Sequence, residues 1–145
     1  MTMSPAFPSN RQPVIGIDLG TTNSALYAAE PGIPGESSSR IRLFSIPQLT
    51  GPGEINRLPV LPSFVYLAGD YDVQRESLRM PWDTAVAVPD RMVGAYARDH
   101  GSRIPARLVS SAKSWLCHSG VDRKAPILPW GTDDSIPKIS PVQAS

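Results

Sequence analysis

The sequence predicts an α/β domain, because short apolar runs that suit β-strands occupy its first half and helical patterns follow in its second half. The predicted strands cover residues 14–19, 24–29, 41–46, 64–67 and 85–88, and the predicted helices cover 90–99 and 106–117. The 145 residues leave room for one ordinary domain, and an apolar fraction of 41% is enough to form a core.

The first strand combines apolar residues with one carboxylate. Val14, Ile15, Ile17 and Leu19 predict a buried strand, since β-branched residues pack well on a pleated sheet. A carboxylate is costly to bury without water, a cation or hydrogen-bond donors. We therefore expect Asp18 to lie at an end of the strand that is open to solvent.

A Gly-Thr-Thr-Asn turn follows this strand directly. Gly20 can adopt backbone angles that a side chain forbids, which would let the chain turn back and present the amides of Thr21, Thr22 and Asn23. Amides converging beside two hydroxyls form an anion cradle, and a nearby carboxylate can hold Mg²⁺ directly or through water. The pattern suits the terminal phosphates of a nucleotide. The alternative is a plain hairpin connection in which Thr and Asn serve only the turn.

Further strands are expected after the turn. Residues 24–29 can return beside the first strand as a hairpin, and the strand at 41–46 should end at Pro47. Residues 50–56 form a turn-rich connection, and 61–68 contains the apolar run 64–67 as a fourth strand.

Two helices are expected in the second half. Asp90 is a suitable N-cap for the first, and Gly101 would end it. The second, over 106–117, places Lys113 away from the centre of its apolar stripe, so that this lysine could extend toward a cleft. The alternative for Lys113 is a solvated lysine on the helix surface.

Four stretches resemble the DnaK-type heat-shock chaperones. The first phosphate-binding signature of that family, I-G-I-D-L-G-T-T-N-S, stands unbroken from Ile15 to Ser24. Residues 57–65 resemble its T-P-S-x-V segment, with Leu61 where Thr is usual. Residues 93–97 resemble its V-G-x-x-A helix start, and 111–116 resembles the segment with its catalytic lysine, although the neighbours of Lys113 depart from the usual Ile-Lys-Arg pattern.

The resemblance implies an actin-like, ribonuclease H-like ATPase lobe that is incomplete, with a mixed sheet and two helices. It implies ATP and Mg²⁺ as ligands, with Lys113 reaching the γ-phosphate and the attacking water, and Asp18 binding Mg²⁺ through water. By the same resemblance the β- and γ-phosphates would be held by Gly20, Thr21, Thr22 and Asn23.

The resemblance covers residues 13–120 in patches and implies a partial nucleotide-binding domain there. We expect residues 1–12 to form a disordered lead-in and 121–145 a proline-rich irregular tail, because many of the 16 prolines fall in these regions and in the loops. The family's second phosphate loop, adenosine pocket and peptide-binding part have no counterpart in the sequence. Unfolded peptides and co-chaperones would therefore be partners only through a longer protein.

The expected function is ATP binding by the N-terminal portion of a chaperone ATPase, with hydrolysis by this chain alone doubtful. The D-x-G-T-T core also occurs in actin-like sugar kinases, so a phosphotransferase fragment is one alternative. A non-catalytic interaction module that keeps the lobe's fold is another.

Charge and cysteine content indicate which partners and compartments are to be expected. A formal net charge of +1 provides no field to attract nucleic acid or an anionic membrane. Cys117 is the only cysteine, which excludes an internal disulfide. Cys117 and His118 are adjacent, but the sequence has no second cluster at metal-ligand spacing, so we do not expect a metal site built on protein ligands. No signal peptide or long apolar run is apparent, so we expect a cytoplasmic protein.

Overall fold

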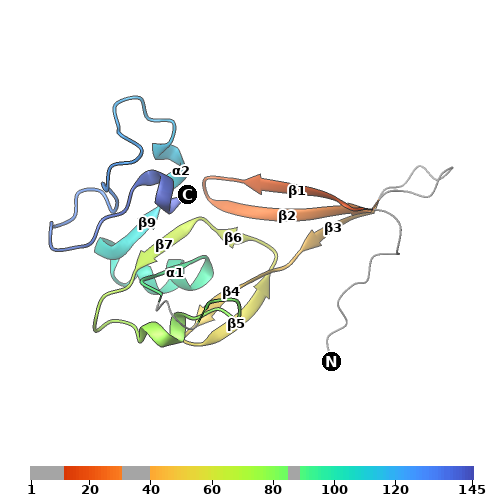
Figure 1. Cartoon of the computed structure of the whole chain (residues 1–145), viewed down its shortest axis with the longest axis horizontal. Coiled ribbons are helices and arrows are strands. Elements are labelled where there is room, and N and C mark those ends of the chain that lie inside the picture. The colour runs from red at the N-terminus through yellow and green to blue at the C-terminus, as the bar shows by residue number, and fades with distance from the viewer. Residues whose placement is uncertain (1–11, 31–39, 85–88) are drawn as a thin grey trace.

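The computed structural model describes residues 12–30, 40–84 and 89–145, which form a mixed α/β architecture (Figure 1). In these residues the strands fall into three small sheets, and every strand pairing is antiparallel. The single mixed sheet that was expected is therefore absent from the described residues, and an actin-like fold stays a prediction. Residues 1–11 of the expected lead-in over 1–12, and the strand predicted at 85–88, lie outside the described residues.

The predicted hairpin is confirmed. Strand β1 (Val14–Leu19) pairs antiparallel with β2 (Asn23–Glu30), with Asp18 opposite Ala25. Strand β3 (Arg40–Phe44) pairs with the other edge of β2, and the two-residue strand β6 (Leu61–Pro62) pairs with the start of β2. We call the β1–β2–β3 sheet the arm, because it projects beyond the other elements (Figure 1).

The arm corrects the prediction that the first strand is buried. All six residues of β1 are exposed, with Val14 at 68% and Leu19 at 67% of full accessibility. Burial requires a second layer packed on the sheet. Because β1 pairs only with β2, and no described element packs extensively on β1, its apolar side chains face solvent.

The next hairpin also differs from expectation. Strand β4 (Ile46–Gly51) pairs with β5 (Glu54–Leu58), so the expected end of a strand at Pro47 is wrong and the turn-rich stretch is mostly strand. Proline is tolerated here because, among the described residues, β4 pairs with β5 alone and the missing N–H breaks no second ladder. The connecting turn contains Gly53, whose φ of 68° favours glycine.

The third sheet places β7 (Phe64–Leu67) between β8 (Arg91–Val93) and β9 (Leu108–Ser110). Helix α1 (Ala95–Gly101) starts after Gly94, so the predicted helix start at Asp90 is wrong, and Asp90 accepts a 2.8 Å hydrogen bond from Arg91 instead. Residues 91–93 extend as a strand because they pair with β7, an interaction that helix periodicity does not reveal. The Ala95 amide donates to Oε1 of Gln48.

The predicted helix over 106–117 is also wrong. This stretch divides into the short 3-10 helix η2 (Pro105–Arg107), strand β9 and helix α2 (Ala112–Trp115). Val109 pairs with Val65 of β7, and Ser111 adopts a left-handed φ of 53° that separates strand from helix. Lys113 thus lies on a short helix rather than in the middle of a long one.

Strand β7 divides the core. Its successive side chains point to opposite faces, so Tyr66 joins one apolar cluster with Leu49, Leu78 and Met92, while Val65 and Leu67 join another. The first cluster adjoins the 3-10 helix η1 (Arg75–Leu78).

The second cluster is completed by the C-terminal segment that was expected to be irregular. Leu128 and Ile139 form a bridge and are buried against Val65, Leu67 and Val109. The short helix α3 (Pro141–Ala144) follows, with a capping box in which Ser140 and Gln143 satisfy each other's backbone amides. Leu128 and Ile139 of the C-terminal segment therefore share a core with β7 and β9.

Candidate phosphate-binding site

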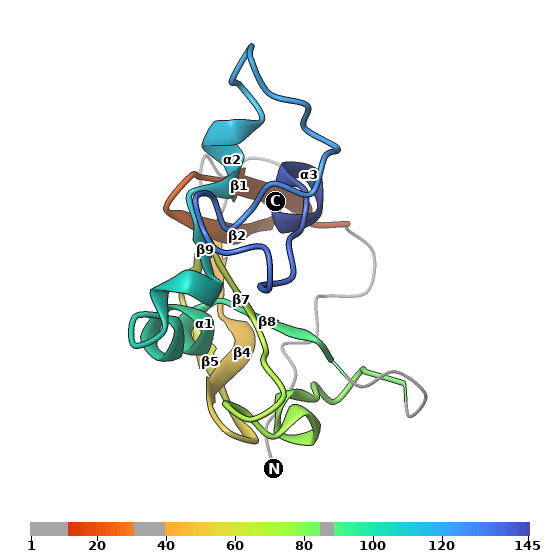
Figure 2. The same cartoon turned by 90° about the vertical axis from the view of Figure 1, so that its left-hand side faces the viewer.

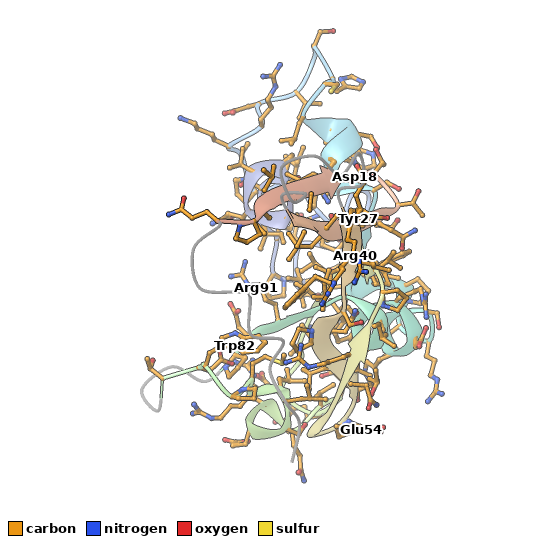
Figure 3. All side chains as sticks on the ribbon, turned by 90° about the vertical axis from the view of Figure 1, so that its right-hand side faces the viewer. Asp18, Tyr27, Arg40, Glu54, Trp82 and Arg91 are labelled. Carbon is orange, nitrogen blue, oxygen red and sulfur yellow. The ribbon has the colours of Figure 1, made fainter. Side chains whose placement is uncertain are left out.

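The closed end of the β1–β2 hairpin holds most of the residues that the sequence singled out. Asp18 lies near the end of β1, and Thr21, Thr22 and Asn23 follow, all four exposed to solvent. Figure 3 shows Asp18 on the arm, apart from Trp82 and Arg91. The location of Asp18 at a solvent-open strand end matches the expectation.

Gly20 is required for a reason other than the one inferred from the sequence. In the described residues a left-handed φ is found at Gly53, Gly94 and Gly131 among the glycines, and not at Gly20. A Cβ at Gly20 would instead lie 2.5 Å from the carbonyl oxygen of Asn23. The turn therefore requires glycine because its two ends approach each other closely.

Residues 61–63 pair with this turn and form hydrogen bonds to its backbone. Strand β6 pairs Pro62 with Asn23, and the Ser63 amide donates a 2.8 Å hydrogen bond to the carbonyl of Thr22. The Ser63 hydroxyl donates a second hydrogen bond, of 3.0 Å, to the carbonyl of Gly20. Two carbonyls of the turn are thus bonded to one residue more than 40 positions away in sequence.

Lys113 comes to the same place from α2. Its ammonium donates hydrogen bonds of 3.0 Å to the Ser63 hydroxyl and 3.3 Å to the Ser24 hydroxyl. Figures 1 and 2 both show α2 beside the closed end of the β1–β2 hairpin. Lys113 is half-buried and Ser24 is buried, so the ammonium is held at the base of the turn rather than freely in solvent.

The sequence did not point to Ser24 and Ser63 as candidate site residues. Both lie within stretches that drew attention, Ser24 as the last residue of the phosphate signature and Ser63 as the serine of the T-P-S-like segment. Their place in the candidate site depends on contacts with Lys113, which lies 89 positions from Ser24 and 50 positions from Ser63. No local pattern reveals such a contact.

The side chains at the turn fit a hydrated Mg²⁺ bound with phosphates better than a metal held by protein ligands alone. The described residues contain no group of three or more His, Cys, Asp or Glu side chains that could hold a metal ion. Mg²⁺ usually keeps several waters and takes one or two carboxylates plus substrate phosphates. An exposed Asp18 beside hydroxyls suits that arrangement, with Lys113 as the nearby positive charge.

The tryptophans line a cavity or pack against other rings. Trp82 and Arg91 line a cavity of about 480 Å³ next to β4 and β8. Trp115 and Trp130 pack against each other with ring centroids 5.2 Å apart. Cys117 and His118 are exposed, and His118 lies beside the Trp115 ring.

Comparison with known proteins adds one relative. Over 100 residues, 67% of this chain, the sequence is 36% identical to a protein of Cupriavidus necator described as a chaperone protein HscA homolog. The chain resembles part of a chaperone. The aligned residues make up 14% of that protein, so the likeness supports a relationship to the heat-shock chaperones over a limited region.

Two other comparisons return nothing. No protein-family model and no solved structure matches the chain. Among the described residues, no helix is long and apolar enough to cross a membrane.

Proposed function

We propose that this chain carries the phosphate-binding part of a DnaK-type chaperone ATPase lobe and binds ATP with Mg²⁺ at the β1–β2 turn. The observation that carries the proposal is the position of Lys113, whose ammonium lies within hydrogen-bond distance of Ser24 and Ser63 at the base of the turn. A cation beside a glycine-containing turn and an exposed carboxylate is suited to the charges of Mg²⁺·triphosphate.

The roles of the residues follow from their chemistry. Thr21 and Thr22 offer exposed hydroxyls to phosphate oxygens, and the exposed Asn23 side chain adds an amide. Asp18 would hold Mg²⁺ through water, and the metal would supply charge neutralisation at the phosphates. Lys113 would donate from its ammonium to a terminal phosphate oxygen.

The proposal concerns binding rather than rapid turnover. Phosphoryl transfer requires groups that position metal, water and phosphates from several sides. The turn, Asp18 and Lys113 supply one side of such a site. ATP-driven peptide binding and co-chaperone contacts are proposed only for a complete chaperone of this family.

The likeness to a chaperone favours this proposal over a sugar-kinase fragment, since the similar protein is a chaperone homolog. The chaperone and sugar-kinase proposals predict different reactions. Phosphorylation of a sugar by the purified chain would contradict the chaperone proposal, and nucleotide binding without any sugar phosphorylation would support it.

Thermal unfolding with and without ATP and Mg²⁺ tests the binding. A ligand that binds only the folded state stabilises it by about 2.7 kcal/mol at a concentration of 100 times its Kd, which raises the melting temperature by several degrees. We expect Asp18→Ala to abolish the rise. Asp134→Ala, which removes an exposed carboxylate from the C-terminal segment, is the matched control and should retain it. A wild-type protein that melts cooperatively but shows no rise at millimolar ATP would refute the proposal.

A further inference from the structure

We infer that Ser63 is the positioning residue of the phosphate turn, because it joins the Lys113 ammonium to the backbone that would bind phosphate. Three of its hydrogen bonds meet at this point: the hydroxyl accepts from Lys113 at 3.0 Å, the hydroxyl donates to Gly20 at 3.0 Å, and the amide donates to Thr22 at 2.8 Å. Ser63 would act on the nucleotide only through these groups. Its effect on nucleotide binding rests on the proposed function, whereas its link to Lys113 does not.

The first consequence concerns the peptide planes of the turn. A planar trans peptide places its C=O and the next residue's N–H on opposite sides. Because the Gly20 carbonyl points to Ser63, the Thr21 amide points away from Ser63. Without the Ser63 hydroxyl this peptide could rotate, and a carbonyl oxygen in place of an amide would repel a phosphate.

The second consequence concerns the Lys113 ammonium. A serine hydroxyl has one proton, and here it is donated to the Gly20 carbonyl, so the oxygen's lone pairs are free to accept from Lys113. The ammonium has three protons, of which Ser63 and Ser24 take two. The third has no partner among the residues that the structure describes. It is therefore available for a phosphate oxygen.

Ser24 provides a matched control within the same site. Its hydroxyl also accepts from Lys113, at 3.3 Å, but among the described residues it is not bonded to a carbonyl of the turn. Removing Ser24 should loosen the lysine without releasing the Gly20 peptide. Removing Ser63 should do both.

The nucleotide test compares ATP and ADP affinities of the wild-type chain, Ser63→Ala and Ser24→Ala by calorimetric titration with Mg²⁺. A hydrogen bond to a charged group corresponds to roughly tenfold or more in affinity. We expect Ser63→Ala to weaken ATP binding about tenfold and to lower the ATP-to-ADP affinity ratio, with a smaller effect for Ser24→Ala. Ser63→Thr, which keeps the hydroxyl, should restore the ratio. A ratio unchanged in Ser63→Ala overturns the inference.

A second test needs no nucleotide. In a double-mutant cycle, Ser63→Ala and Lys113→Met should change the unfolding equilibrium constant non-additively by about threefold or more, because both remove the same contact. Ser63→Ala combined with Lys124→Met, which changes an exposed lysine, should be additive. Ser63→Cys takes the place of Ser63→Ala if the alanine variant does not fold.

The two tests separate this inference from the proposed function. Coupling between Ser63 and Lys113 with no nucleotide response in the wild-type chain would refute nucleotide binding and keep the Ser63–Lys113 link. A nucleotide response with additive effects in the cycle would overturn the role of Ser63 and keep the proposed function.

Discussion

Gly20 and Asn23 approach each other so closely across the β1–β2 turn that a Cβ on Gly20 would lie 2.5 Å from the Asn23 carbonyl oxygen. Real Cβ atoms do not come this near to a backbone oxygen, so the turn would have to open. The close approach links the shape of the candidate phosphate site to a single glycine. Gly16, two residues before Asp18 in the same hairpin, has no atom within 4 Å of the corresponding position.

This contrast predicts different effects for the same substitution. Gly20→Ala should lower the free energy of unfolding by about 1 to 3 kcal/mol, as overpacking does elsewhere. Gly16→Ala should be neutral or slightly stabilising, because alanine loses less backbone entropy on folding. Urea unfolding of the two variants measures both effects. Equal stabilities would contradict the observed geometry of the turn.

The environment of Tyr66 predicts that the free energy of unfolding depends on pH in the alkaline range. Burial, followed by the hydrogen bond that its hydroxyl donates to Asp72, raises the pKa of Tyr66 well above its usual range. An unfolded tyrosine loses its proton near pH 10, while folded Tyr66 keeps it. The contribution of Tyr66 to the free energy of unfolding is therefore fully present below about pH 10, and above that pH the free energy of unfolding falls by up to about 1.4 kcal/mol per pH unit.

The measurement is the free energy of unfolding between pH 9 and pH 11. Tyr66→Phe should make this dependence shallower. Tyr71→Phe removes a fully exposed phenol and should leave the slope unchanged. A wild-type slope identical to that of Tyr66→Phe would disprove the assignment.

Leu128 tests whether the C-terminal segment is part of the core. Its side chain is 2% exposed in the cluster formed with β7 and β9, so Leu128→Ala should cost about 2 to 5 kcal/mol. Val142→Ala, at a position that is 53% exposed on the same segment, should cost less than about 0.5 kcal/mol. Denaturant unfolding compares the two variants. A small effect for Leu128→Ala would mean that the segment does not pack on the sheet in solution.

We expect the exposed apolar positions of the arm to tolerate polar substitution. Ile17 is 65% exposed on β1, so Ile17→Thr should change the free energy of unfolding by less than about 0.5 kcal/mol. Val109 is 2% exposed on β9, and Val109→Thr should cost about 1 to 3 kcal/mol because it buries a hydroxyl. If both substitutions prove equally costly in urea, the arm is covered by another surface in solution.

The sequence predicted the hairpin and the solvent-open position of Asp18 because both depend on local chemistry. A β-branched run, a glycine turn and a returning strand specify one another over residues 14–29, and a carboxylate favours the exposed strand end. The glycine itself was also recognised. The sequence did not reveal why glycine is required at position 20, since the close approach of Gly20 and Asn23 exists only in three dimensions.

The helices were misassigned because pairing overrode local pattern. Met92 and Val109 have neighbours at helical spacing, yet each lies in a strand bonded to β7. The partner residues in these two pairings lie between 24 and 46 positions apart in sequence, so periodicity within a short window does not reveal them.

The sequence by itself determined the composition of the candidate site: a carboxylate, a glycine turn, hydroxyls, and a lysine further along the chain. Tertiary structure alone decided that Lys113 meets the turn through Ser24 and Ser63, and that residues 121–145 complete a core. It also decided that β1 is exposed, because burial depends on which elements pack against a strand and not on the strand's own residues.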